Sequence, residues 1–227
     1  MTDPGSEAAG PASCPVCRGR RVGLFLAVGG RGYWRCDSCA ATFLDRADLP
    51  GPEAEAARYR EHRNDPDDPG YLAHLRRLAD PMLARLPPVR AGLDYGCGPS
   101  PALARLFTAA GHSVRRYDPL FCPERAALRA TYDFIACSEV AEHFHRPALE
   151  FARLDRLLRP GGLLGVMTRF LVDDGGFANW HYRRDPTHVV FYKPETFRLL
   201  AARLGWDCEL PGPDVALMRR PASRTGS

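Results

Sequence analysis

Short apolar runs alternate with helix-like segments from residue 91 onward, and this alternation constrains the fold more than any other feature of the chain. Such a pattern predicts parallel strands connected by crossover helices, and therefore an α/β doubly wound sheet. The expected strands are Gly92–Cys97, Val114–Tyr117, Phe134–Cys137 and Leu163–Met167, with Trp206–Leu210 and Asp214–Arg219 as a terminal strand pair. The expected helices are 71–86, Pro101–Ala110, Glu124–Arg129, Pro147–Leu158 and 194–204.

Four of the eight cysteines form two Cys-x2-Cys pairs separated by 18 residues: Cys14 and Cys17, then Cys36 and Cys39. This spacing is typical of a closed, structural zinc site, with two redox pairs as the alternative. Apolar runs at Val22–Val28 and Tyr33–Arg35 flank a glycine turn, which predicts a hairpin between the pairs. We therefore expect a zinc ribbon over residues 13–45, either a packing module or one that docks nucleic acid.

The remaining segments suggest how the chain is organised. Residues 1–12 are expected to be a disordered N-terminus, 46–70 a linker with a short helix at Glu53–His62, 71–220 the α/β domain and 221–227 a flexible tail. No apolar run reaches the roughly 18 residues that a membrane helix needs, and the N-terminus lacks the features of a signal peptide. The expected location is cytoplasmic. A net charge of +4 neither requires nor excludes a nucleic-acid partner.

A glycine-containing loop follows the first strand of the α/β region. Gly96 and Gly98 allow a sharp turn and a close approach of backbone to ligand, and the next helix begins directly after them. Pro101 replaces the third glycine of a dinucleotide-binding fingerprint. Asp118 ends the next strand about 20 residues later, where a carboxylate accepts ribose hydroxyls. The alternative for Asp118 is a turn initiator before Pro119.

These residues resemble the class I S-adenosylmethionine-dependent methyltransferases over residues 71–220. The resemblance rests on Asp94 before the glycines, Asp118, the strand Tyr132–Glu139 and the lead-in Leu158–Gly162. It implies a Rossmann-like seven-stranded sheet with a reversed final strand, and S-adenosylmethionine at the carboxyl ends of the strands. The implied cofactor-binding residues are Asp94, Gly96, Cys97 and Gly98 for the methionine part, Asp118 for the ribose and Ser138 through its backbone.

Two departures from the family pattern stand out. Ser100 occupies a position where the family usually has glycine, and no third strand is recognisable between Asp118 and Tyr132. The residues that would bind adenine are therefore not assigned.

A second cluster of polar residues follows the strand at 134–137. Glu139, Glu142 and His143 have helical spacing and are expected on one helix face beside the cofactor. His188 lies in the insert after the strand expected at Leu163–Met167, the usual substrate-facing region of the family. The pattern resembles the ubiquinone-biosynthesis and the Hen-type O-methyltransferases, and in the latter the matching residues bind a divalent metal. The candidate set is Glu139, Glu142, His143 and His188.

The alternative to a second metal is that Glu142-His143 is a hydrogen-bonding pair at a helix start, as in many relatives, and that His188 acts as a base or orients an aromatic group. His143 and His188 are the candidate catalytic residues, each as a general base or through a shared metal. The favoured function is O-methylation of a small molecule by a methyltransferase that carries a zinc ribbon. The loop after the strand expected at Phe134–Cys137 lacks the Asn/Asp-Pro-Pro-aromatic sequence of relatives that methylate amines or amides. An RNA methyltransferase that docks RNA through the ribbon, and a non-catalytic cofactor-binding interaction protein, are the alternatives. The sequence makes no prediction of oligomeric state.

Overall fold

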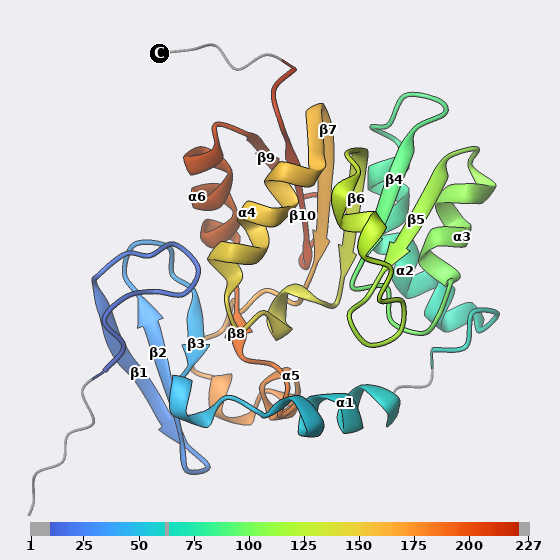
Figure 1. Cartoon of the computed structure of the whole chain (residues 1–227). Helices are drawn as coiled ribbons and strands as arrows, with labels where there is room; N and C mark the ends of the chain where they lie inside the picture. The colour runs from blue at the N-terminus through green and yellow to red at the C-terminus, as the bar shows by residue number, and fades with distance from the viewer. Residues whose placement is uncertain (1–9, 62–63, 223–227) are drawn as a thin grey trace, which may run out of the picture.

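The computed structural model describes residues 10–61 and 64–222. Its larger sheet has six strands in the order β5-β4-β6-β7-β10-β9 (Figure 1). The predicted disordered N-terminus lies mainly outside the described residues, and so does most of the predicted tail. The bounds of the strands are β4 Ala91–Tyr95, β5 Ser113–Tyr117, β6 Tyr132–Ser138, β7 Leu158–Met167, β9 Asp207–Glu209 and β10 Val215–Arg219.

The strand directions match the fold that the sequence predicts. Strands β5, β4, β6 and β7 pair in parallel, whereas β10 lies antiparallel to both β7 and β9. The reversed strand and the terminal pair are therefore confirmed. The strand count of seven is corrected to six for the described residues. In place of the unrecognised third strand, the chain forms an isolated bridge between Asp118 and Cys122 and a short 3-10 helix, η2 (Arg125–Arg129).

Helices cover both faces of this sheet because its strands are apolar on both sides. On β4 and β6, Leu93 and Ile135 face one core, whereas Phe134 and Ala136 face the other. The first core contains α4 (Pro147–Leu157) and α6 (Pro194–Leu204), and the second contains α2 (Pro69–Leu83) and α3 (Ala102–Ala109). Alternation of side chains along a strand is the physical reason for this three-layer arrangement.

The helix boundaries differ from the expected ones by a few residues, with one change of type. The helix expected at 71–86 begins at Pro69, capped by the Asp68 side chain, and ends at Leu83. The helix expected at Glu124–Arg129 is the 3-10 helix η2, which the Glu124 carboxylate caps by accepting from the N–H of Ala126. A strand expected from Leu163 already begins at Leu158.

The N-terminal cysteine region forms the predicted hairpin and a further strand. β1 (Val22–Val28) pairs with β2 (Arg31–Cys36), and β2 pairs with β3 (Thr42–Leu44). β3 also pairs with β8 (Val190–Phe191), so the smaller sheet has the order β1-β2-β3-β8. Because β8 comes from the insert after β7, this sheet joins the cysteine region to the α/β region.

The predicted linker contains the 3-10 helix η1 (Arg46–Asp48) and the helix α1 (Pro52–Glu61). The sequence placed this helix at Glu53–His62, and His62 lies outside the described residues. In Figure 1, α1 lies beneath the larger sheet and near α5 (His181–Arg184), and its Arg58 side chain donates to Asp185, the residue after α5. No helix in the described residues has the length and apolar character needed to cross a membrane.

Candidate active site and cysteine cluster

The four patterned cysteines meet in one buried cluster. Cys14 Sγ lies 3.6 Å from Cys39 Sγ, and Cys17 Sγ lies 3.5 Å from Cys36 Sγ. All four sulfur atoms lie within 4.8 Å of one another, and no cysteine of the cluster is more than 4% exposed. Four thiolates at these positions form the closed donor set of a structural zinc site.

The backbone of each cysteine knuckle prepares it for this role. Arg18 and Ala40, which follow the second cysteine of each pair, adopt left-handed conformations with φ of 58° and 60°. Burial raises the pKa of Cys17, and the N–H of Gly19, which donates to Cys17 Sγ at 3.4 Å, opposes this effect. The hydrogen bond between Cys14 and Cys39 lowers the pKa of Cys14 to about 6 and raises that of Cys39, so without an ion the two sulfur atoms share a proton. The residues present therefore fit a zinc ion.

A cavity of about 790 Å³ lies at the carboxyl ends of β4, β5 and β6. Parallel strands bring their following loops to one edge of the sheet, which is where ligands bind in open α/β sheets. All the residues that the sequence assigns to the cofactor and to catalysis line this cavity: Asp94, Gly96, Cys97, Gly98, Asp118, Ser138, His143 and His188. The roles of the individual residues remain predictions.

The glycine loop has a conformation that glycine alone adopts readily. Gly96 has φ of 73°, and a Cβ atom there would lie 2.5 Å from the Val140 side chain. Gly98 has φ of 56°, and among the described residues a Cβ atom there would meet nothing within 4 Å. Gly96 therefore permits the turn, and Gly98 leaves open space beside the backbone for a ligand.

Arg116 holds the outer side of this loop and was not anticipated from the sequence. Its Nη2 donates to the carbonyl oxygens of Gly98, Pro99 and Ser100 at 2.9, 3.1 and 3.0 Å. No sequence signal distinguishes Arg116 from the other arginines of this arginine-rich chain. Ser100 is accommodated without a left-handed conformation.

Asp94 is a buried carboxylate with unused bonding capacity. It is 2% exposed, and its Oδ2 has no hydrogen-bond partner in the described part of the chain. Burial raises the pKa of Asp94 to about 7, against the opposing effect of Arg116. A ligand that brings a positive charge and N–H donors would compensate this carboxylate, and S-adenosylmethionine has both.

Asp118 makes the turn that the alternative interpretation predicted, and it also contacts the glycine loop. Its Oδ1 accepts from the N–H groups of Leu120 and Phe121 at 2.8 and 2.9 Å. Its Oδ2 accepts from the N–H of Gly98 at 3.1 Å. A carboxylate has about four acceptor positions, so this arrangement leaves capacity for a ribose hydroxyl.

A second group of residues that line the cavity consists of two histidines and a glutamate, and we call it the acceptor site. Candidate ligand atoms of Glu142, His143 and His188 lie within 4.8 Å of one another. The predicted helix at 139–143 is wrong: only Ala141–His143 form a 3-10 helix, η3, and Glu139 adopts φ of 53°. As a result Glu139 does not join the three-residue set, although it lines the same cavity.

Hydrogen bonding determines the tautomer of His143. Its Nδ1 lies 2.9 Å from the carbonyl oxygen of Thr187, and a carbonyl only accepts, so Nδ1 bears the hydrogen. Burial lowers the pKa of His143, which favours the neutral ring with its lone pair on Nε2. Burial also lowers the pKa of His188, to about 4, and its buried Nδ1 lacks a partner among the described residues.

Tyr182 is a member of this site that sequence reasoning did not assign. Its hydroxyl donates to Glu142 Oε1 at 2.6 Å, and its ring centroid lies 4.1 Å from that of His188. Burial raises the pKa of Glu142 well above its usual range, and Glu139 adds to the effect. Trp180 packs on Tyr182 with a centroid distance of 5.1 Å, so these two rings pack inside the insert and do not line the cavity.

Residues from α1 and α2 also line the cavity, and none of them was assigned to the site from the sequence. Glu55 and Tyr59 of α1 and Tyr71 and His74 of α2 line it. The Tyr59 ring meets the His143 ring edge-on at 5.2 Å, and Glu55 pairs with His145 Nε2 at 3.0 Å. The amphipathic pattern of α2 was visible in the sequence, but nothing in the polar α1 indicated a place at the site.

The fold and this cavity define a Rossmann-like protein with its cavity at the carboxyl edge of a mostly parallel sheet, the edge where such folds bind ligands. The sequence matches the family model described as a methyltransferase domain over residues 59–210, and the chain belongs to this family. A comparison with curated proteins finds no match.

Many solved structures share the fold, including two methyltransferases with bound S-adenosylhomocysteine. One is the 1,6-didemethyltoxoflavin-N1-methyltransferase of Burkholderia thailandensis, with bound 1,6-didemethyltoxoflavin and S-adenosylhomocysteine. It is 16% identical, with a TM-score of 0.52, over 86% of this chain and 98% of that one. The other is the magnesium protoporphyrin IX methyltransferase of Synechocystis PCC 6803 with bound S-adenosylhomocysteine, which is 14% identical with a TM-score of 0.50 over 74% and 94%. The protein thus has the fold of S-adenosylmethionine-dependent methyltransferases.

Proposed function

We propose that the chain transfers a methyl group from S-adenosylmethionine to a hydroxyl oxygen of a small molecule. The observation that carries this proposal is the His143 Nδ1–H bond to Thr187, which leaves the Nε2 lone pair in a ring that lines the cofactor cavity. When bound, S-adenosylmethionine supplies an electrophilic methyl group on a sulfonium that leaves as S-adenosylhomocysteine. His143 Nε2 takes the proton of the acceptor hydroxyl, and His188 orients that hydroxyl.

The shape of the site supports a small acceptor. The cavity has a volume in the range of small-molecule sites. Glu55 and Tyr59 of α1 line it, and the Tyr59 ring packs on His143 of the acceptor site. Such a cavity fits a compact molecule better than a nucleic-acid strand that runs along a surface. The structures of similar fold also include one with a small-molecule substrate bound.

A divalent metal at Glu142, His143 and His188 is a second arrangement that one observation favours. Glu142 Oε2 and His188 Nδ1 are buried and have no hydrogen-bond partner within residues 10–61 and 64–222. Buried polar atoms are normally satisfied, and a cation would satisfy both. Such an ion supplies positive charge beside the acceptor oxygen. Glu139 lies beside this set, because the Tyr182 hydroxyl contacts both glutamates, but Glu139 is not one of its three members.

The proposal is tested by mass spectrometry after incubation with methyl-labelled S-adenosylmethionine and fractions of metabolites or of RNA. We expect label on a hydroxyl of a small molecule, and loss of labelling in a His143→Gln variant that still binds the cofactor. Label on RNA alone would support the alternative in which the ribbon docks nucleic acid. Cofactor binding without transfer to any fraction would support a non-catalytic interaction protein.

A further inference from the structure

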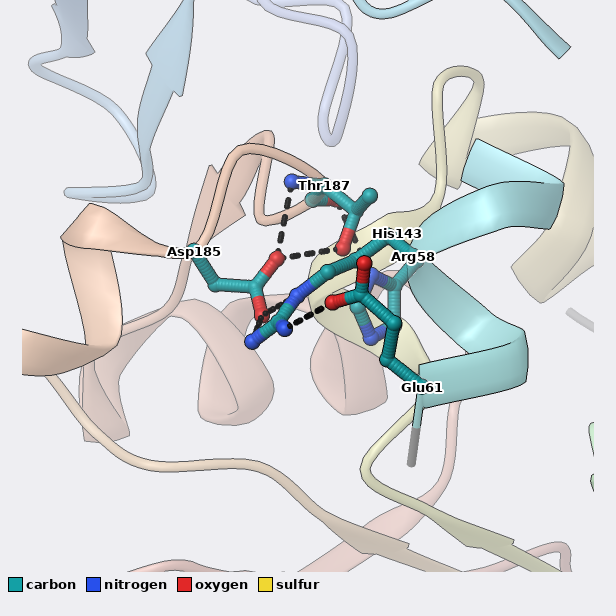
Figure 2. Close-up of polar contacts among 5 residues, drawn as sticks. All are labelled: Arg58, Glu61, His143, Asp185 and Thr187. Atoms are coloured by element: carbon teal, nitrogen blue, oxygen red, sulfur yellow. Dashed lines mark hydrogen bonds and ion pairs between the residues drawn. The ribbon is translucent and has the colours of Figure 1, made fainter. Parts of the chain in front are cut away.

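A chain of hydrogen bonds runs from the linker helix α1 to the imidazole of His143 (Figure 2). Arg58 in α1 donates from Nε and Nη2 to Asp185 Oδ2 at 3.0 and 2.8 Å. The other oxygen, Oδ1, accepts from the backbone N–H and the hydroxyl of Thr187 at 2.9 and 2.6 Å. The carbonyl oxygen of Thr187 then accepts the Nδ1–H of His143.

Asp185 is the central member of this chain. Its side chain is 12% exposed, and each of its two oxygens has a separate partner. Burial opposes its ionisation, but the hydrogen bonds from Thr187 and Arg58 outweigh burial and hold the pKa of Asp185 well below its usual range. The carboxylate is therefore charged, and it needs both partners because an unpaired buried charge is costly.

Arg58 is fixed in place on its own helix as well. Its Nη1 donates to Glu61 Oε2 at 2.8 Å, three residues later on α1, so every nitrogen of the guanidinium has a carboxylate partner. The planar fork then presents Nε and Nη2 together to one carboxylate oxygen. Lysine has the charge but not this geometry.

The turn that Asp185 organises also carries His188. The N–H of His188 donates to the carbonyl oxygen of Asp185 at 3.2 Å, and the N–H of Val189 donates to that of Glu142 at 2.8 Å. The turn is thus tied to the segment that bears His143. Displacement of Asp185 would move both histidines of the acceptor site.

We propose that Arg58 is a positioning residue of the acceptor site, which acts through Asp185 and Thr187 to hold His143 as the Nδ1–H tautomer. This role rests on the proposed function, in which His143 Nε2 takes the proton. Arg58 lies one residue before the region that the family model matches, so the linker supplies part of the catalytic arrangement. The opposing view is that the Arg58–Asp185 pair only attaches α1 to the surface.

The first experiment reads the tautomer directly. Nitrogen-15 imidazole spectra, with the His143 signals assigned by their loss in His143→Gln, should show Nδ1–H in the wild-type protein. Arg58→Ala and Asp185→Asn should yield a mixture of tautomers or exchange broadening. Arg60→Ala is the matched control, because Arg60 is an exposed arginine on the same helix. An unchanged Nδ1–H signal in both Arg58→Ala and Asp185→Asn would overturn the proposal.

The second experiment separates turnover from binding. With the acceptor found in the labelling experiment, Arg58→Ala should lower kcat by about 10- to 100-fold, the usual effect of removing a residue that orients a histidine. The Kd for S-adenosylmethionine should match that of Arg60→Ala. Arg58→Ala should have the lower Tm, because it leaves the buried Asp185 charge without its cation, so turnover is measured well below the Tm of both variants. Arg58→Lys should recover only part of kcat, because it keeps the charge and loses the fork. Equal kcat for Arg58→Ala and Arg60→Ala would contradict the positioning role.

The two proposals fail in distinguishable ways. If His143→Gln leaves turnover intact, the proposed function of His143 is wrong, whatever the tautomer spectra show. If His143→Gln abolishes turnover while Arg58→Ala changes neither tautomer nor kcat, His143 acts without the help of α1 and only the positioning proposal is wrong.

Discussion

Thr42 in β3 pairs through its backbone with Phe191 in β8, three residues after His188. Leu44 donates its N–H to the carbonyl oxygen of Val189 at 2.8 Å, and the Thr196 hydroxyl donates to the carbonyl oxygen of Cys39 at the same distance. The cysteine cluster and the acceptor site are therefore neighbours in one hydrogen-bonded structure. Loss of the cysteine cluster should therefore disturb the backbone around His188 at the acceptor site.

We expect the purified protein to contain one tightly bound zinc ion and the Cys36→Ser variant to lose it. Metal binding supplies much of the folding free energy of small cysteine modules, so residues 13–45 should exchange amide hydrogen faster. Increased exchange should extend to Val190–Phe191 because β8 pairs with β3. Cys208→Ser is the control, since Cys208 lies in β9 outside the cluster. Protein prepared without chelators that contains no zinc would contradict this prediction.

Replacement of Asp118 should weaken the binding of S-adenosylmethionine. Asp118→Ala should cost about 1.5–3 kcal/mol, the range for a hydrogen bond to a charged group. Part of the loss would come from the turn at Leu120 and Phe121, so Asp118→Asn, which retains an acceptor oxygen, should cost less. Calorimetry measures both affinities. Unchanged affinity in Asp118→Ala would show that Asp118 serves only the turn.

Binding of S-adenosylmethionine should depend on the ionisation of Asp94. Burial raises its pKa to about 7, so the carboxyl group is increasingly protonated below that pH. A cationic ligand prefers the ionised form, and the affinity should therefore fall by up to about tenfold per pH unit below pH 7. Calorimetric titrations of wild-type protein and Asp94→Asn separate this effect from the titration of the ligand itself. Identical pH profiles of affinity for the two proteins would show that binding does not depend on the ionisation of Asp94.

His188→Ala should lower turnover at least about 100-fold, because His188 orients the acceptor hydroxyl toward His143, while cofactor affinity stays within about twofold. His181→Ala is the control, because His181 is exposed and lies in the same insert. If a metal is bound at Glu142, His143 and His188, Glu142→Gln should be similarly damaging, and a chelator should inhibit without removal of the ribbon zinc. Full activity in chelator would eliminate the metal. Full activity of His188→Ala would eliminate both the metal and the orienting role of His188.

The attachment of the ribbon should weaken in acid through Asp174. Hydrogen bonds from Arg35 and Lys193 outweigh burial and hold the pKa of Asp174 at about 2. A lowered carboxyl pKa stabilises the fold above the ordinary value of about 4, and this contribution disappears as the pH falls toward 2. Because the Asp174 side chain is 43% exposed, Asp174→Asn should cost below about 1 kcal/mol at neutral pH. Denaturant unfolding at a series of pH values should show the two proteins converge in acid.

The sequence by itself determined the features that depend on local periodicity and on spacing along the chain. The alternation of apolar runs predicted the parallel sheet, and the Cys-x2-Cys pairs predicted the cluster of four sulfur atoms. The reversed strand was implied by the resemblance to the methyltransferase family. Gly96, Gly98 and Asp118 were assigned to the cofactor because a strand, a turn and a helix place them at one edge of the sheet, and Asp94 was added by the family resemblance.

Only the tertiary structure decided which distant residues meet at the acceptor site. Arg58, Tyr182 and Arg116 carry no local signal, since each acts through a partner that is remote in the sequence or on another element. Glu139 left the predicted helix because its backbone turns into the left-handed region at the end of β6. Local patterns record which face of an element is buried, whereas the pairing of polar groups across elements follows from packing, and packing is a property of the whole chain.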